Sequence, residues 1–111
     1  MNWNEIKEKY PKVYRLAKMW WIDEADLSQF EPFELNEGIN VNFRYLYDFF
    51  DEQKIIIDIG YHRLSMYSFM IFDNDSIVFG RDDNPELGYL TRTEAEQAAF
   101  EKAFEILESK L

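Results

Sequence analysis

The stretch KIIIDIGYHRLSMYSFMIFDNDSIVFG, residues 54–80, decides the fold. Two segments within it, 54–61 and 65–73, are rich in β-branched and aromatic residues, which predicts two strands. The tetrapeptide DNDS at 73–76 predicts a tight turn, because Asn and Asp tolerate left-handed backbone conformations and hydrogen-bond to their own backbone. A third strand is expected over 76–81, so the stretch predicts a three-stranded antiparallel meander of two successive hairpins.

The second of these strands is apolar on both of its faces. Its side chains alternate between two sets, Tyr67, Phe69 and Ile71 on one face and Met66, Met70 and Phe72 on the other. An antiparallel sheet commonly keeps one polar face toward water. We therefore expect this sheet either to be covered on both faces or to use one face as an interface. The candidate interaction surface consists of Met66, Met70, Phe72, Trp20 and Trp21.

Two helices are expected before the sheet. Apolar residues recur at helical spacing over 3–22, and Pro11 is expected to kink this helix near Tyr10 or to open a second helix. Residues 23–41 are the least regular part, with a short helical turn expected near their start. Apolar side chains at i, i+3, i+4 and i+7 then predict a helix over 43–53.

The last helix, over 92–110, has the clearest start signal. A Ser or Thr followed three residues later by Glu forms a capping box, which satisfies the first free N–H groups of a helix. Thr93 with Glu96 fits this pattern, and Thr91 with Glu94 offers a second frame for it. An apolar stripe runs along the rest of the segment, so one face of this helix is expected in the core.

These elements predict an α+β fold in the order α, short α, α, β, β, β, α. The helices are expected mainly on one face of the three-stranded sheet. A chain of 111 residues suits a single domain, 1–111, and 18% aromatic residues supply large side chains for its core. Because the chain has no cysteine, no disulfide or thiolate site is expected.

The formal net charge of −10 is unevenly distributed along the chain. Residues 1–18 carry five Lys or Arg against two Glu, whereas residues 19–111 carry seven Lys or Arg against twenty Asp or Glu. Most of the surface would repel a phosphate backbone, so no direct nucleic-acid binding is expected. The N-terminus has no apolar signal segment, and the longest uncharged run, 64–72, is too short to span a bilayer. The sequence therefore predicts a cytoplasmic protein without membrane contact.

No group of residues predicts catalysis. His62 is the single histidine, and neither its neighbours nor a cysteine suggest a nucleophile or a His-rich metal site. The acids between Asp73 and Glu86 lack the spacing of an EF-hand and are expected in a solvated turn and loop. Asp48 and Asp51 are expected on the solvated side of their helix. We therefore expect no catalytic, cofactor-binding or metal-binding residues.

The order α-β-β-β-α resembles that of the double-stranded-RNA-binding domain. That family reads RNA with basic residues at the start of its last helix. Here the helix begins TRTEAEQ, in which Arg92 stands among acids. The likeness therefore implies a topology and not RNA binding.

Three segments carry a second resemblance: NWNEIKEKYPKVY at 2–14, RYLYDFFDEQKIIIDI at 44–59 and TRTEAEQAAFEKAFEILESKL at 91–111. They resemble a group of small acidic proteins encoded by gut anaerobic bacteria and their phages or mobile elements. The resemblance covers most of the chain and is weakest over 23–41. No activity is assigned to that group, so the resemblance implies an accessory protein of a phage or mobile element and no site residue.

Three functional hypotheses follow. The leading one is a non-enzymatic protein–protein interaction module, whose partner is another protein or a second copy in a homodimer. The second is an acidic inhibitor that mimics nucleic acid and occupies a DNA- or RNA-binding protein, which requires acids in a band with phosphate-like spacing. The third is a small hydrolase or ligand binder based on carboxylates, which requires a pocket that holds two acids, one with a raised pKa.

Overall fold

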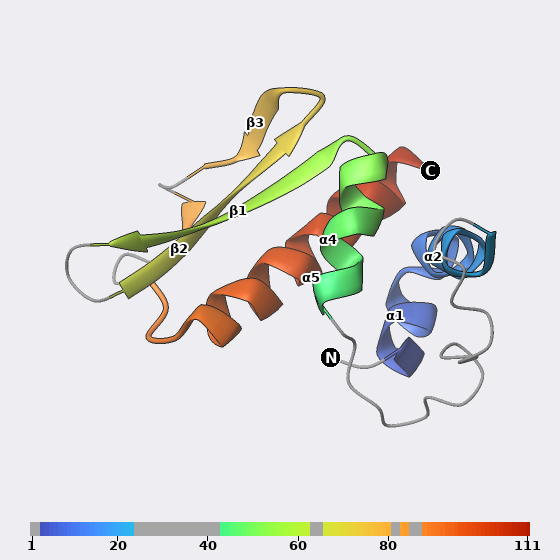
Figure 1. The fold of residues 1–111 in the computed structure, drawn as a ribbon, viewed down its shortest axis with the longest axis horizontal. Coiled ribbons are helices and arrows are strands. Elements are labelled where there is room, and N and C mark those ends of the chain that lie inside the picture. Colours follow the sequence, from blue (N-terminus) through green and yellow to red (C-terminus); the bar gives the residue numbers. More distant parts are fainter. Residues whose placement is uncertain (1–2, 24–42, 63–65, 81–82, 85–87) are drawn as a thin grey trace. The chain divides into compact units, whose positions relative to one another are not determined.

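The computed structural model describes residues 3–23, 43–62, 66–80, 83–84 and 88–111 (Figure 1). The elements are α1 (Trp3–Lys9), α2 (Pro11–Asp23), α4 (Phe43–Glu52), β1 (Ile55–His62), β2 (Met66–Asp73), β3 (Ser76–Phe79) and α5 (Arg92–Lys110). This order of helices and strands confirms the α+β fold with a three-stranded antiparallel sheet. The short turn expected near the start of 23–41 lies outside the described residues.

The chain forms two compact units. Unit 1 contains α1, α2 and the end of α5, Phe104–Leu111, whereas unit 2 is Phe43–Ala103 and contains α4, the sheet and the first part of α5. The single domain expected from chain length stays a prediction.

Pro11 separates two helices where one kinked helix over 3–22 was the first expectation. The alternative, in which Pro11 opens a second helix, is confirmed, because α1 ends at Lys9 and α2 begins at Pro11. Proline has no N–H to donate, and the first turn of a helix is where this loss costs least. Tyr10 links the two helices, since its N–H donates to the Ile6 carbonyl at 2.7 Å and its carbonyl accepts from Tyr14 N–H at 2.9 Å.

Unit 1 packs its helices around a small apolar core. Its buried side chains are Ile6, Val13, Tyr14, Ala17, Phe104 and Leu107. The Tyr10 and Phe104 rings stack, with centroids 5.6 Å apart and an interplanar angle of 16°. The start of α2 is held by Glu108, whose Oε1 accepts hydrogen bonds from the backbone N–H groups of Lys12 and Val13, both at 3.0 Å.

The sheet of unit 2 has the strand order β1-β2-β3, with both neighbouring pairs antiparallel. Asn74 and Asp75 connect β2 to β3 with φ values of 49° and 70°, as the DNDS turn chemistry predicts. At the same end of the sheet, Lys54 has a φ of 63° and its N–H donates to the Asp51 carbonyl, so α4 ends and β1 starts at Ile55, one residue later than expected.

The third strand ends at Phe79, two residues before the expected boundary of 76–81. A side chain ends it, because Gly80 N–H donates to Asp83 Oδ2 at 2.8 Å. Asn84 then takes the place of a strand beside β2: its Nδ2 donates to the Phe69 carbonyl at 2.8 Å, and its Oδ1 accepts from Phe69 N–H at 3.1 Å. An amide side chain offers the same donor and acceptor as a peptide group, so Asn84 continues the hydrogen-bonding edge that β3 leaves.

Residues 88–89 extend this edge further. Tyr67 and Tyr89 exchange both backbone hydrogen bonds, at 2.7 and 2.8 Å. Gly88 makes this approach feasible, since it has a φ of 70° and a Cβ there would lie 2.7 Å from the Tyr67 carbonyl oxygen. Tyr67, Phe69 and Ile71 thus pair in turn with Tyr89, the Asn84 side chain and Phe79.

The two faces of the sheet differ in burial. The inner face carries Ile55, Ile57, Phe69 and Ile71, all buried, and Figure 1 shows α4 and α5 on one side of the sheet. Contacts run along α5 on this face, from Arg92 over the Tyr67 ring to Lys102 over the Phe79 ring. The other buried apolar residues of unit 2 are Leu46, Phe49, Phe50, Ala95, Ala99, Phe100 and Ala103. The helices of unit 2 thus cover one face of the sheet, as expected.

The bounds of α5 agree with the expected 92–110, but the capping frame is the second of the two. Thr91 Oγ1 accepts a hydrogen bond from Glu94 N–H at 3.1 Å, and the Thr91 carbonyl accepts from Ala95 N–H at 3.2 Å. The expectation that Thr93 caps the helix is therefore wrong, because Thr93 already lies inside the first turn.

Candidate interaction surfaces

The outer face of the sheet carries a row of apolar side chains across all three strands. Ile56 pairs with Phe72, and Phe72 pairs with Ile77, so the three side chains lie next to one another on this face. Ile56 is 42% exposed and Ile77 is 58% exposed, whereas Phe72 is half-buried. We call Ile56, Phe72 and Ile77 the apolar row. On an antiparallel sheet these solvent-side positions are commonly polar, so the row is a candidate interface.

Three of the five residues expected in the interaction surface lie together on the outer face of the sheet. Met66, Met70 and Phe72 share the outer face of β2, and all three are half-buried. Asp58 pairs with Met70 and is exposed, which sets a negative charge beside the apolar row. Trp20 is half-buried in α2 and belongs to unit 1, so its part in this surface stays a prediction. The Trp21 side chain lies outside the described residues.

The inner face ends in a row of three tyrosines that the sequence did not single out. Tyr61 pairs with Tyr67 across β1 and β2, and Tyr67 pairs with Tyr89. The Tyr61 and Tyr67 rings meet edge to face, with centroids 5.1 Å apart and an angle of 63°. We call Tyr61, Tyr67 and Tyr89 the tyrosine row.

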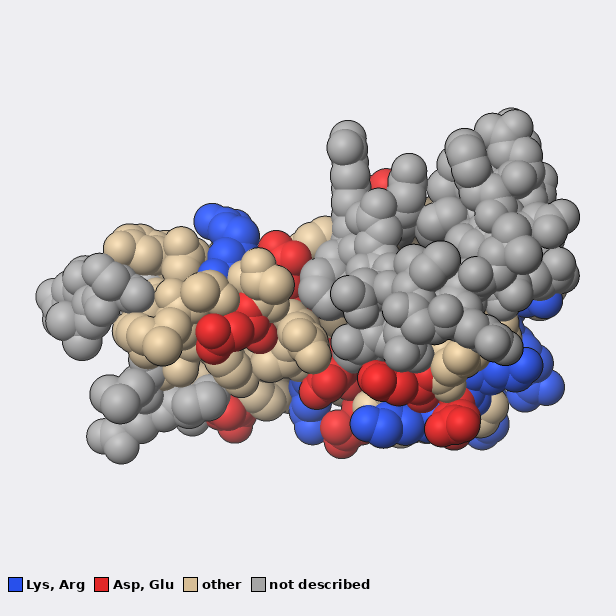
Figure 2. Space-filling view, turned by 90° about the horizontal axis from the view of Figure 1, so that it is seen from below, with Lys and Arg blue, Asp and Glu red and all other residues tan. Residues whose placement is uncertain are grey.

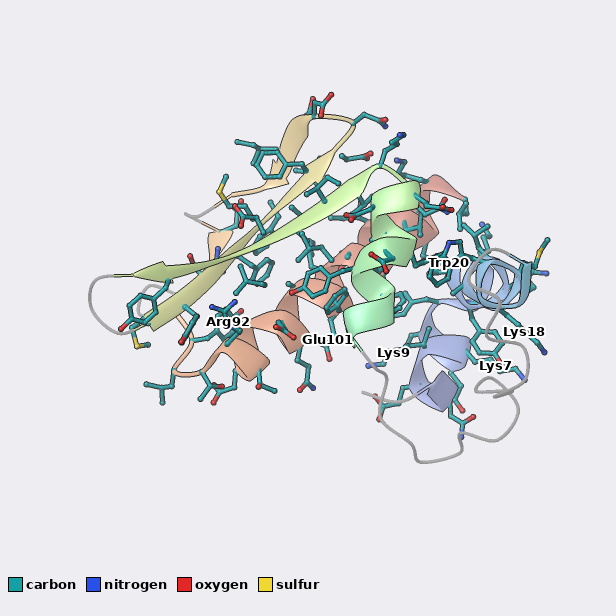
Figure 3. All side chains as sticks on the ribbon, viewed as in Figure 1. Lys7, Lys9, Lys18, Trp20, Arg92 and Glu101 are labelled. Atoms are coloured by element: carbon teal, nitrogen blue, oxygen red, sulfur yellow. The ribbon has the colours of Figure 1, made fainter. Side chains whose placement is uncertain are left out.

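Arg92 lies over the middle of the tyrosine row. Its guanidinium carbon is 5.5 Å from the centroid of the Tyr67 ring, within the range of a cation–π contact. Figure 3 shows Arg92 at the start of α5, next to the ends of β1 and β2. Tyr61 at the edge of the row is 62% exposed, so the row is open to solvent on that side.

Two tyrosines of unit 2, Tyr47 and Tyr89, have a raised pKa. Burial, with a smaller contribution from the negative charge of Glu96, raises the pKa of Tyr47 to about 12, and the positive charge of Arg92 opposes this shift. The Tyr47 ring meets Phe100 edge to face at 4.9 Å, so its ring belongs to the core. Burial also raises the pKa of Tyr89, with a smaller contribution from the negative charge of Glu101. Both hydroxyls are therefore protonated at neutral pH and act as neutral polar groups.

Unit 1 presents a basic face. Lys7, Lys9, Lys12 and Arg15 are exposed on α1 and α2, and Lys7 Nζ lies 5.6 Å from the centroid of the Tyr14 ring. Figure 2 shows Lys and Arg atoms gathered over these helices, and Figure 3 shows Lys7 and Lys18 extending from them. The apolar residues Val13, Tyr14 and Ala17 of α2 are buried in the core of unit 1.

The carboxylates offer no enclosed site in the described part of the chain. Asp48 and Asp51 are exposed on α4, as expected, and burial and the charge of Asp48 raise the pKa of Asp51. Among the described residues, no three His, Asp or Glu side chains are placed to share a metal ion. The His62 side chain lies outside the residues described, although its backbone ends β1.

No described helix is both long enough and apolar enough to cross a membrane. Comparison with known proteins adds no relative: no family model, no curated protein and no solved structure matches this chain.

Proposed function

We propose that the protein is a non-enzymatic interaction module that binds another protein through the outer face of its sheet. The observation that supports this proposal is the apolar row, where Ile56 and Ile77 flank Phe72 in direct register. Burying apolar surface contributes about 25 cal/mol per Å², so exposed side chains of this size favour association.

The charge on this face favours a partner other than a second copy. Asp58 is exposed beside the apolar row. In a symmetric dimer both copies would bring this face, so two Asp58 carboxylates would enter one interface, and each chain carries a net charge of −10. The partner that fits has an apolar surface flanked by a Lys or Arg side chain that meets Asp58.

The other two hypotheses have less support. Three basic residues, Arg92, Lys102 and Lys110, are interspersed among the five glutamates of α5. This pattern does not favour a continuous band of negative charge like that of a nucleic acid. The exposed positions of Asp48 and Asp51 do not favour a catalytic pair of carboxylates. A role in a phage or mobile element stays a prediction that rests on the sequence resemblance.

The test compares two matched substitutions. Ile77→Glu places a charge in the apolar row, and Met19→Glu places one at a similarly exposed residue of unit 1, since Ile77 is 58% and Met19 is 61% exposed. Both variants should fold, because substitutions at exposed sites usually change stability by about 0.5 kcal/mol or less. Tagged wild type and variants would be used to capture partners from a bacterial lysate, with quantification of every protein bound.

We expect a partner that Met19→Glu retains and Ile77→Glu loses by about tenfold or more. Asp58→Lys should weaken capture of the same partner, because it replaces an attraction by a repulsion. Recovery of the same proteins with Ile77→Glu would refute the proposal. A wild-type dimer in light scattering that Ile77→Glu converts to a monomer would assign the face to a second copy instead.

A further inference from the structure

The tyrosine row and Arg92 form a second surface, on the face of the sheet opposite the apolar row. Tyr61 and Leu90 are the most exposed large apolar or aromatic residues among those described, at 62% and 71%. Both belong to this end of unit 2, since Tyr61 begins the row and Leu90 follows Tyr89 directly. Tyr and Arg are also the residue types most enriched where binding energy concentrates in protein interfaces.

The backbone holds this surface in place. Tyr67 and Tyr89 exchange two hydrogen bonds, and the close approach at Gly88 leaves no room for a side chain between the two segments. Thr91 then caps the helix that carries Arg92. Arg92 is therefore attached to the row through residues 88–92, whose backbone is held by Tyr67 at one end and by the helix cap at the other. This restraint lowers the conformational entropy that the surface would lose when a ligand binds.

Arg92 provides a cation for recognition. No hydrogen bond or salt bridge within the described part of the chain engages its guanidinium, which contacts the Tyr67 ring through a cation–π interaction. A guanidinium stacked on an aromatic face keeps its in-plane N–H groups for a second partner. Those groups match a carboxylate, which accepts two parallel hydrogen bonds from them.

We propose that the tyrosine row and Arg92 bind a linear segment of a partner protein in which an Asp or Glu side chain is flanked by aliphatic or aromatic residues. The carboxylate pairs with Arg92, while a flanking side chain covers Tyr61. A single acid is the best fit, because the chain carries a net charge of −10 and would repel a segment with several acids.

The test uses capped tripeptides as probes. One has the sequence acetyl-Leu-Asp-Phe-amide, and its matched control has Asn in place of Asp. Binding would be followed by the amide shifts of isotope-labelled full-length protein in NMR titrations. We expect the Asp peptide to shift the signals of Tyr61, Tyr67 and Arg92, and to bind about tenfold more tightly than the Asn peptide, as a charge-assisted pair should.

Three variants distinguish the loss of the pair between Arg92 and the peptide carboxylate from a loss of the fold. Arg92→Gln should abolish the preference for Asp over Asn, whereas Lys102→Gln, which removes the other cation–π contact on this face, should preserve it. Arg92→Lys keeps the charge without the planar fork and should reduce the preference by a few fold, which tests the proposal even if Arg92→Gln unfolds.

Equal binding of the Asp and Asn peptides, or an unchanged preference in Arg92→Gln, would overturn the proposal. Tighter binding of an uncapped Leu-Asn-Phe acid than of the Asp peptide would also overturn it, since this would assign the site to a chain terminus. None of these results depends on the apolar row, because Ile77→Glu should leave the peptide titration unchanged.

Discussion

Replacing Glu108 by alanine should destabilise unit 1 by about 2 kcal/mol. The Glu108 carboxylate accepts hydrogen bonds from the N–H groups of Lys12 and Val13 at the start of α2. Water can replace the bond to Lys12, which is exposed, but Val13 is fully buried. Leaving a buried donor without an acceptor costs about 1–3 kcal/mol, and a negative charge at a helix N-terminus contributes about 0.3–1 kcal/mol.

Two variants divide this energy between hydrogen bonding and charge. One oxygen, Oε1, accepts from both N–H groups at 3.0 Å, so Glu108→Gln can keep these two bonds while it loses the charge and the longer contact of Lys12 N–H with Oε2, at 3.3 Å. Its expected cost is about 0.5–1 kcal/mol. Glu8→Ala is the control in unit 1, because Glu8 is exposed, and it should change stability by about 0.5 kcal/mol or less.

Urea unfolding followed by tryptophan fluorescence measures these differences. All three tryptophans, Trp3, Trp20 and Trp21, lie in α1 and α2, so their fluorescence reports on unit 1. A loss of about 2 kcal/mol should lower the urea midpoint by about 1 M at an unchanged slope. If Glu108→Ala is as stable as the wild type, or Glu108→Gln is as costly as Glu108→Ala, the account of this helix cap is wrong.

Three further predictions concern unit 2. Asn84→Asp replaces the donor to the Phe69 carbonyl by a second acceptor, so it should lower the free energy of unfolding by about 2–3 kcal/mol; equal stability in urea would contradict this. Gly88→Ala should cost about 1–3 kcal/mol, because the left-handed φ is strained for alanine and the new methyl group meets the Tyr67 carbonyl oxygen. Faster hydrogen exchange at the Tyr67 amide would be its signature, and unchanged exchange would speak against the close approach. Finally, the raised pKa of Tyr47, about 12 against 10.0, adds stability that is complete below pH 10 and is lost as the pH rises toward 12. Tyr47→Phe should therefore flatten the decline of stability in this range, and parallel curves for the variant and the wild type would refute the assignment.

The meander could be predicted because local signals agree along its strands. The alternation around Ile55 and Ile57 assigns the inner face, and two left-handed residues, Asn74 and Asp75, form the turn that DNDS predicts. The bounds of α5 followed from its apolar stripe, although sequence alone left two capping frames open. Thr91 is the cap because its backbone lies just outside the helix, which depends on where the preceding segment pairs with the sheet.

The end of β3 and the tyrosine row could not be predicted in the same way. The third strand ends early because the side chains of Asp83 and Asn84 bind backbone groups of Gly80 and Phe69. A hydrophobic periodicity does not predict such hydrogen bonds between a side chain and the backbone. The pair of Tyr61 and Tyr67 follows from the register of one hairpin, which tyrosine spacing alone does not fix. Tyr89 joins them from a segment outside the named strands, so no strand pattern marked it.

One edge of the sheet depends on the side-chain amide of Asn84, so it lasts only as long as that amide is not lost by deamidation. Asparagine amides are lost over time when the backbone nitrogen of the next residue attacks the side-chain carbonyl and forms a cyclic imide. Residue 85 is proline, whose backbone nitrogen carries no hydrogen and cannot form that ring. The amide that pairs with Phe69 is therefore protected from spontaneous deamidation by its neighbour in the chain, and this edge of the sheet should keep its hydrogen bonds during long storage.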